Sequence, residues 1–184
     1  MRMRCLSVSR LMSGPVVIAL LLGAAQAHAS GIESAGTDIA VALPLLAGGL
    51  TVYKGDWTGT AELGADTVAT VGTTYLLKTF VKEQRPDKSD FKSFPSDTAA
   101  LAFAPAQFLW DRYGWQYGLP AYAAAVFVGY SRVDAKKHHW WDVATSAGLS
   151  YGFSKLFTTP YRRGFNYRAS AAPDGVFASV DYRF

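Results

Sequence analysis

The chain has 184 residues, half of them hydrophobic, with 18 basic and 14 acidic residues and a single cysteine. A chain of this length forms one domain, even if a leader peptide is removed from its N-terminus. With only one cysteine it cannot form an internal disulfide, so stability must come from a buried apolar core. This composition excludes a disulfide-rich secreted scaffold and a disordered polar chain.

The first 29 residues have the layout of a secretory signal peptide. Three arginines and no acidic residue precede a short apolar run, and Ala27 and Ala29 suit cleavage before Ser30. The apolar core, about 12 residues, is short for a bilayer-spanning helix, which favours a cleaved leader over a retained anchor. We therefore predict a signal peptide over 1–29 and a mature protein in the periplasm or cell envelope.

Cleavage would also change the charge. The leader carries three arginines and no acid, so the mature chain would hold 15 basic and 14 acidic residues, a net charge of +1 rather than +4. The excess of positive charge is thus a property of the leader, and it does not indicate a nucleic-acid partner.

The sequence of residues 30–160 predicts a series of apolar helices. The apolar block Ile39–Tyr53 comes first, and the spacing of apolar residues predicts a helix over Leu63–Val81. A polar, proline-containing stretch, 83–97, must then be a loop. Further helices are predicted over Thr98–Trp110, with Ser96 or Asp97 as N-cap, over Leu119–Tyr130, and over Asp142–Phe157.

These blocks predict an all-α fold, a compact helical bundle. No block reaches 18 consecutive apolar residues, so transmembrane helices are not required, and contact with a membrane surface or the inner membrane stays open. After Pro160 the residues alternate apolar and polar around Pro173-Asp174-Gly175. That pattern predicts a short C-terminal β-hairpin over 161–184.

Three polar clusters interrupt the apolar helices, and together they suggest a site for a phosphoryl group. The first holds Lys78 and Arg85, the second holds Ser96 at a helix start, and the third is the stretch "SRVDAKKHHWWD". A phosphoryl dianion needs several fixed cations, and a helix N-terminus adds backbone N–H donors. Each cluster alone would be unremarkable, because basic residues and serines are common at helix ends.

Within the third cluster, His138 and Asp142 lie four residues apart. In a helical turn both side chains lie on one side, so that the carboxylate can orient the imidazole. A carboxylate that holds one ring nitrogen leaves the other free to attack an electrophile.

The three clusters resemble the signature of the type 2 phosphatidic acid phosphatase superfamily, which includes bacterial acid phosphatases and vanadium haloperoxidases. Lys78 is followed after six residues by Arg85-Pro86, and Ser131-Arg132 after five residues by His138 and after three more by Asp142. The resemblance implies that His138 is a nucleophile forming a phosphohistidine and that Asp142 orients it. It assigns phosphoryl binding to Lys78, Arg85, Arg132 and Ser96, and it implies no metal and no cofactor.

The middle motif departs from the family pattern. "FPSDTAALAF" aligns with the family's "FPSGHTxxAF", which puts Asp97 at the glycine and Thr98 at the histidine that serves as general acid. A positioned general acid typically contributes about 10²–10⁴ in rate. Three alternatives remain: Asp97 acts instead, His139 acts instead, or the substrate's leaving group needs no proton.

The sequence therefore predicts a metal-independent phosphatase acting on a phosphomonoester or pyrophosphate, lipid-linked or small and soluble, through a phosphohistidine. The alternative is a catalytically impaired relative that binds anionic head groups or serves as a structural envelope protein. The retained pair of His138 and Asp142 favours the enzyme, because anion binding alone does not need it.

Overall fold

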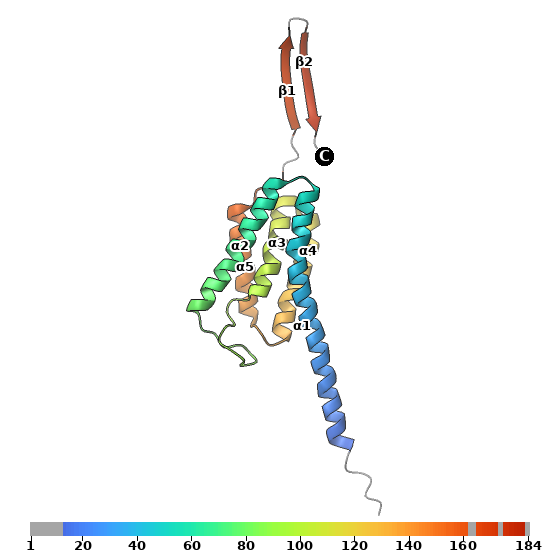
Figure 1. The fold of residues 1–184 in the computed structure, drawn as a ribbon, viewed down its shortest axis with the longest axis vertical. Helices are drawn as coiled ribbons and strands as arrows, with labels where there is room; N and C mark the ends of the chain where they lie inside the picture. Colours follow the sequence, from blue (N-terminus) through green and yellow to red (C-terminus); the bar gives the residue numbers. More distant parts are fainter. Residues whose placement is uncertain (1–12, 162–164, 173–174, 183–184) are drawn as a thin grey trace, which may run out of the picture.

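The structure is a computed structural model that describes the backbone of residues 13–161, 165–172 and 175–182 and the side chains of residues 31–161. Five helices account for most of the chain, and the prediction of an all-α bundle is confirmed (Figure 1). The helices are α1 (Ser13–Tyr53), α2 (Trp57–Phe80), α3 (Asp97–Tyr113), α4 (Trp115–Asp134) and α5 (Trp140–Phe157).

Helix α3 lies at the centre of the bundle and contacts the other four helices (Figure 1). Its sequence explains this position, because small alanine side chains make up five of its 17 residues, and all five are buried. The buried set of α3 includes Ala99, Ala100, Ala102, Ala104, Ala106 and Phe108. Alanines let neighbouring helices approach closely, and burial of apolar surface stabilises the bundle by roughly 25 cal/mol for each Å² removed from water.

The helix boundaries follow from capping residues that lie at or just outside the predicted ends. Helix α2 begins at Trp57, before the predicted Leu63, because Asp56 caps it by accepting a hydrogen bond from the N–H of Gly59 at 2.9 Å. Ser96 is the N-cap of α3, one of the two residues expected there. Between α3 and α4, Gly114 has a φ of 90°, a conformation that favours glycine and allows the chain to reverse direction.

Helices α2 and α5 bury polar side chains and expose apolar ones. On α2, Asp66, Thr70 and Thr74 are fully buried at intervals of four residues, and Ser146, Ser150 and Ser154 follow the same spacing on α5. Exposed large apolar side chains include Val68 and Leu76 on α2, Leu45 and Leu46 on α1, and Leu119 and Val126 on α4. The periodicity is helical, as predicted, but in α2 and α5 the buried face is the polar one.

The N-terminal helix α1 runs without a break from Ser13 to Tyr53, and its part from Gly31 to Tyr53 is long and apolar enough to cross a membrane. It is the one such helix among the residues searched, those that the structure describes. Residues 1–12 of the predicted signal peptide lie outside the described residues, and cleavage after Ala29 stays a prediction.

Two strands follow the helices. Strand β1 (Phe165–Ala172) pairs antiparallel with β2 (Gly175–Tyr182), and Phe165 lies opposite Tyr182. They lie where the hairpin over 161–184 was expected, beyond the end of the bundle in Figure 1. The division into a helical domain over 30–160 and a C-terminal extension stays a prediction.

Candidate active site

The loop between α2 and α3 connects the predicted phosphate-binding lysine to the predicted nucleophile. The ammonium of Lys78 donates to the carbonyls of Lys92 at 3.1 Å and Pro95 at 2.5 Å. The carbonyl of Ser93, between those two residues, accepts a hydrogen bond from Nδ1 of His138 at 2.6 Å. The short stretch of backbone from Lys92 to Pro95 therefore contacts one side chain of α2 and one from the turn that precedes α5.

The hydrogen bonds of His138 determine which ring nitrogen can react. The residue is only 3% exposed, and its Nδ1 lies 3.5 Å from Oδ2 of Asp142. A carbonyl accepts but does not donate, so Nδ1 carries the proton and Nε2 keeps its lone pair. The sequence predicted that a carboxylate would hold this ring, but the backbone carbonyl of Ser93 lies closer to Nδ1 than the carboxylate of Asp142.

Asp142 is fully buried at the first turn of α5 and is held as a carboxylate by hydrogen bonds. Its Oδ2 accepts from the hydroxyl of Ser93 at 2.5 Å and from the backbone N–H of His139 at 2.8 Å. Burial alone would raise the pKa of the Asp142 carboxyl, but hydrogen bonds from His138, Ser93 and His139 hold that pKa below its ordinary value. Among the side chains and backbone of residues 31–161, Oδ1 of Asp142 has no hydrogen-bond partner.

Ser93 is a site residue that sequence reasoning missed. It is completely buried, and it contacts both members of the His–Asp pair, through its carbonyl and through its hydroxyl. In the sequence it is one serine in a polar loop, and neither periodicity nor motif spacing distinguishes it. A buried serine in a loop becomes recognisable only when the loop's path is known.

A pocket of about 350 Å³ is lined mainly by cations, and His138, Asp142 and Ser93 are not among its lining residues. It contains two of the predicted phosphate-binding residues, Lys78 and Arg85, and the predicted catalytic Asp97. Asp97 forms an ion pair with Lys78 at 3.2 Å, and Nε of Arg85 donates to Asp90 at 2.7 Å. The complete lining is Tyr75, Lys78, Thr79, Lys82, Arg85, Lys92 and Asp97. We refer to it below as the cation pocket.

Arg132, the third predicted cation, is buried between α4 and α1 and does not line the cation pocket. Its guanidinium donates to the hydroxyl of Ser131 at 3.2 Å and to the backbone carbonyl of Glu33, whose carboxylate lies 3.7 Å away. Burial lowers the pKa of Arg132, while the carboxylates of Glu33 and Asp97 act in the opposite direction.

The backbone N–H of Ser96, which was expected to bind a phosphoryl group, already has a hydrogen-bond acceptor in the protein. The residue is fully buried, its N–H donates to the carbonyl of Asp142 at 3.4 Å, and its hydroxyl caps α3. Its carbonyl accepts from Ser146 at 2.7 Å. Ser96 therefore joins the start of α3 to α5, and a role in direct phosphate contact stays a prediction.

Thr98 lies on an adjoining pocket of about 200 Å³ between α1, α2 and α3. This second pocket shares Tyr75 and Asp97 with the cation pocket. Its remaining walls are mostly apolar, with Ala40, Val41, Val71 and Leu101. The position that would carry the family's general acid thus bears a threonine among aliphatic neighbours.

His139 is also held by acceptors and is not among the residues that line the cation pocket. Its Nδ1 lies 3.3 Å from Oγ of Ser93, 3.4 Å from Oε1 of Glu83 and 3.6 Å from Oδ2 of Asp142. The ring stacks on Trp141 with centroids 4.3 Å apart. His139 is also the N-cap residue of α5.

The spacing of Glu83, His139 and Asp142 would allow them to hold a metal ion, since their ligand atoms lie within 4.8 Å of one another. The indole N–H of Trp141 donates to Glu83 at 2.7 Å, and Oδ2 of Asp142 already accepts two hydrogen bonds. The three groups therefore already form a connected polar network on one side of the His–Asp pair.

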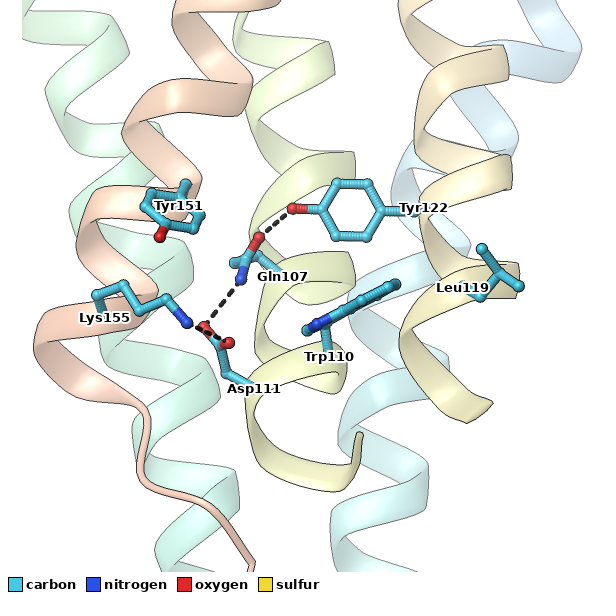
Figure 2. A pocket seen from close by; sticks show the side chains of 7 residues that line it. All are labelled: Gln107, Trp110, Asp111, Leu119, Tyr122, Tyr151 and Lys155. Carbon is cyan, nitrogen blue, oxygen red and sulfur yellow. Dashed lines mark hydrogen bonds and ion pairs between the residues drawn. The ribbon is translucent and has the colours of Figure 1, made fainter. Parts of the chain in front are cut away.

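A larger pocket, of about 600 Å³, lies at the other end of the bundle, between α3, α4 and α5 (Figure 2). Its polar floor is Asp111, which accepts from Lys155 at 2.6 Å and from Gln107 at 2.9 Å, and aromatic side chains form its walls. It contains no predicted site residue and no imidazole. Its size alone does not make it the reactive centre, and the predicted site residues lie at the end of the bundle with His138.

A buried His–Asp pair and a cation-lined pocket in one helical bundle supply the kinds of side chain that phosphoryl transfer uses. Comparison with known proteins agrees. The lipid A 4′-phosphatase of Helicobacter pylori is 33% identical over 136 residues, which are 68% of this chain and 69% of that protein. The lipid A 1-phosphatase of Porphyromonas gingivalis is 33% identical over 108 residues, 52% of this chain and 24% of that protein.

The crystal structure of Aquifex aeolicus LpxE superposes with a TM-score of 0.52 and 20% identity, over 65% of this chain and 83% of that one, which shows the same fold. No protein-family profile matches the chain. On the similarity to these relatives, the chain belongs to the type 2 phosphatidic acid phosphatase superfamily.

Proposed function

We propose that the protein is a phosphatase of lipid-linked phosphate and that His138 is its nucleophile. The observation that carries the proposal is the hydrogen bonding of the His138 imidazole, which is held by Ser93, the residue that follows Lys92 of the cation pocket. Nδ1 donates to the Ser93 carbonyl at 2.6 Å, so that Nε2 is the nitrogen with a free lone pair.

In the proposed reaction, Nε2 of His138 forms a bond to phosphorus while the bond from phosphorus to the leaving oxygen breaks. The positive charge that develops on the ring is balanced by Asp142, 3.5 Å from Nδ1. Lys78, Arg85 and Arg132 neutralise the phosphoryl oxygens, and water then hydrolyses the N–P bond. Because fixed side-chain cations supply this neutralisation, the reaction needs no metal.

The choice of a lipid substrate rests first on the relatives, two of which are named lipid A phosphatases. It rests second on the outer surface of the bundle. No charged side chain occurs over Ile39–Tyr53, Trp115–Tyr130 or Val143–Ser154, and over Leu63–Leu77 the one charged residue, Asp66, is buried. An exterior with no exposed charge over these ranges and with exposed large apolar side chains suits contact with lipid chains.

Aromatic residues border this uncharged zone at both ends. Trp57 and Trp115 are exposed at the end away from the His–Asp pair, and Trp140 and Trp141 are exposed next to it. Tryptophans of membrane proteins gather at the level of the lipid head groups. We infer a bundle embedded in the cell envelope, with the cation pocket at head-group level and, after removal of the signal peptide, facing the periplasm.

A second candidate function is a catalytically impaired protein that binds anionic head groups. Thr98 favours it, because threonine cannot donate a proton as the family's histidine does. The buried network of His138, Asp142 and Ser93 argues for the enzyme, since cations alone would bind an anion.

The test is to trap the covalent intermediate. The protein is mixed with a ³²P-labelled lipid phosphate or lipid diphosphate, quenched in base, and examined for an acid-labile phosphohistidine. We expect labelled wild type, no label on His138→Ala, and retained label on His139→Ala, the matched neighbouring imidazole. Label on His138→Ala but not on His139→Ala would show that the nucleophile is wrongly assigned. A wild type that binds lipid phosphate without labelling would favour the impaired protein.

A further inference from the structure

A cluster of one imidazole and two carboxylates shares Asp142 with the His–Asp pair, and its other members, His139 and Glu83, take no part in the proposed reaction. Nδ1 of His139 lies 3.4 Å from Oε1 of Glu83 and 3.6 Å from Oδ2 of Asp142, and the ligand atoms of all three residues lie within 4.8 Å of one another. Zinc bonds of about 2.0–2.2 Å in tetrahedral geometry place two ligand atoms about 3.3–3.5 Å apart. The two separations from His139 are close to that value.

The negative charge of this cluster is not balanced by basic side chains. Within the side chains of residues 31–161, neither Glu83 nor Asp142 forms an ion pair with a lysine or an arginine. Oδ1 of Asp142, a residue with no exposed surface, has no hydrogen-bond partner among the same residues. Buried anionic oxygens are normally paired with a cation, a metal ion or hydrogen-bond donors. A bound metal ion would supply the missing positive charge.

The protein orients the cluster and leaves one side of it open to solvent. The side chains of Glu83 and His139 are 26% and 25% exposed, so an ion can reach them from water. The indole N–H of Trp141 donates to Oε1 of Glu83 at 2.7 Å, and the indole ring stacks on His139 with 7° between the ring planes. Outer partners of this kind hold metal ligands in place, and losing one typically costs about 10–100-fold in metal affinity.

We propose that Glu83, His139 and Asp142 form a zinc site and that zinc bound there inhibits the phosphatase. The donor set selects the ion, because one imidazole nitrogen and two carboxylate oxygens suit Zn²⁺, whereas Mg²⁺ and Ca²⁺ prefer oxygen ligands alone. Three protein ligands leave the fourth tetrahedral position to a water molecule. The zinc site stands independently of the proposed function, and the inhibition rests on it.

Inhibition follows from the carboxylate that the zinc site shares with the nucleophile. Oδ2 of Asp142 accepts hydrogen bonds from the hydroxyl of Ser93 and the backbone N–H of His139, and it lies 3.5 Å from Nδ1 of His138. A zinc ion on this oxygen withdraws the negative charge that balances the imidazole of His138 during phosphoryl transfer, and the dication itself repels that ring. Zinc should lower kcat and change KM little, because the cation pocket shares no residue with the zinc site.

Calorimetric titration with zinc chloride measures the site directly, on the full chain in detergent, without a histidine tag and free of metal. We expect the wild type to bind one zinc ion per chain, and His139→Ala and Glu83→Gln to bind it at least about 10–100-fold more weakly. Two controls should bind zinc as the wild type does: His138→Ala, the neighbouring imidazole, and Asp134→Asn, an exposed carboxylate outside the cluster.

Two results of the titration would overturn the site. One is a wild type that binds no zinc. The other is binding that His139→Ala and Glu83→Gln both retain, or that only His138→Ala loses, since the ion would then lie elsewhere. His139 and Glu83 are both partly exposed, so their substitution is expected to leave the fold intact.

The second measurement is the hydrolysis of a short-chain lipid phosphate in detergent micelles, with each variant compared with its own zinc-free rate. Zinc should lower the wild-type kcat about tenfold or more, the loss expected when a hydrogen bond to a charged group is removed. Excess EDTA should restore the rate, and EDTA alone should not change the rate of protein prepared without zinc. Mg²⁺ at the same concentration should have no effect, and His139→Ala and Glu83→Gln should resist zinc.

The two measurements keep this inference apart from the proposed function. Zinc that binds at the cluster without lowering the rate, or a rate that requires zinc, would overturn the inhibition. A zinc-free protein that hydrolyses no lipid phosphate and forms no phosphohistidine would refute the proposed function, and the titration would still decide whether the zinc site exists.

Discussion

Helix α1 lies close against α4 at Gly36, and a single methyl group there tests the packing behind Arg132. A Cβ at position 36 would lie 1.9 Å from Oγ and 2.7 Å from Cβ of Ser131, and 3.3 Å from Nη2 of Arg132. Rotation of the serine side chain cannot relieve the contact with its Cβ. Gly36→Ala must therefore move α1 away from α4, and with it Glu33, whose backbone carbonyl accepts a hydrogen bond from Arg132.

The size of the effect can be worked out by comparison with a second glycine of the same helix. Forcing an extra methyl group into a packed interface costs about 1–3 kcal/mol. Replacing glycine by alanine inside a helix also gains about 1 kcal/mol from helix propensity. Gly49→Ala receives only that gain, because nothing lies within 4 Å of the added Cβ. The difference between the two variants isolates the clash, and we expect Gly36→Ala to be the less stable by about 1–3 kcal/mol.

Thermal unfolding of the two purified variants, followed by circular dichroism, measures this difference. For a domain of this size each kcal/mol corresponds to about 2–4 °C, so Gly36→Ala should unfold about 2–12 °C below Gly49→Ala. Adding Ser131→Gly removes both clashing atoms and should restore part of the loss. If Gly36→Ala and Gly49→Ala unfolded within about 1 °C of each other, α1 would not pack on α4 as described here.

Two further predictions concern the His–Asp network. Ser93→Ala removes a buried hydroxyl that donates to Asp142 at 2.5 Å, and a hydrogen bond to a charged group contributes about 1.5–3 kcal/mol. The pKa of Asp142 is lowered in the folded protein, so this stabilisation is present above its ordinary pKa of 3.8 and is lost as pH falls through the lowered value. Denaturant unfolding of Ser93→Ala should show the full loss in free energy of unfolding at pH 7 and a smaller loss below pH 4. An equal loss at these two pH values would contradict the role of Asp142. Separately, prolonged treatment with EDTA should leave the phosphatase rate unchanged. A loss of rate that divalent cations restore would instead point to a metal held by Glu83, His139 and Asp142.

The linear pattern of residues was informative wherever the relevant contacts are local. Apolar residues at intervals of three and four predicted the helices, and Ser96 was recognised as a cap because capping acts within one turn. The spacing of Lys78 to Arg85 and of Arg132 to His138 and Asp142 indicated the superfamily, to which the chain indeed belongs. These features depend on neighbours along the chain, so they can be read from the sequence.

Features that depend on packing between distant segments could not be read in this way. The contact of Glu33 with Arg132 joins residues 99 positions apart, and that of Ser93 with Asp142 joins residues 49 apart. Nothing in the local sequence distinguished Glu33 or Ser93 from other polar residues.

The sequence by itself predicted the helices, the order of the motifs and the spacing of His138, the proposed nucleophile, from Arg132 and Asp142. The tertiary structure decided that a backbone carbonyl holds Nδ1 of His138 and that Lys82 and Lys92 line the cation pocket. It also decided that the polar faces of α2 and α5 point inward. The reason is physical: helix periodicity shows which side chains share a face, but only the packing of the helices decides whether that face meets protein, water or lipid.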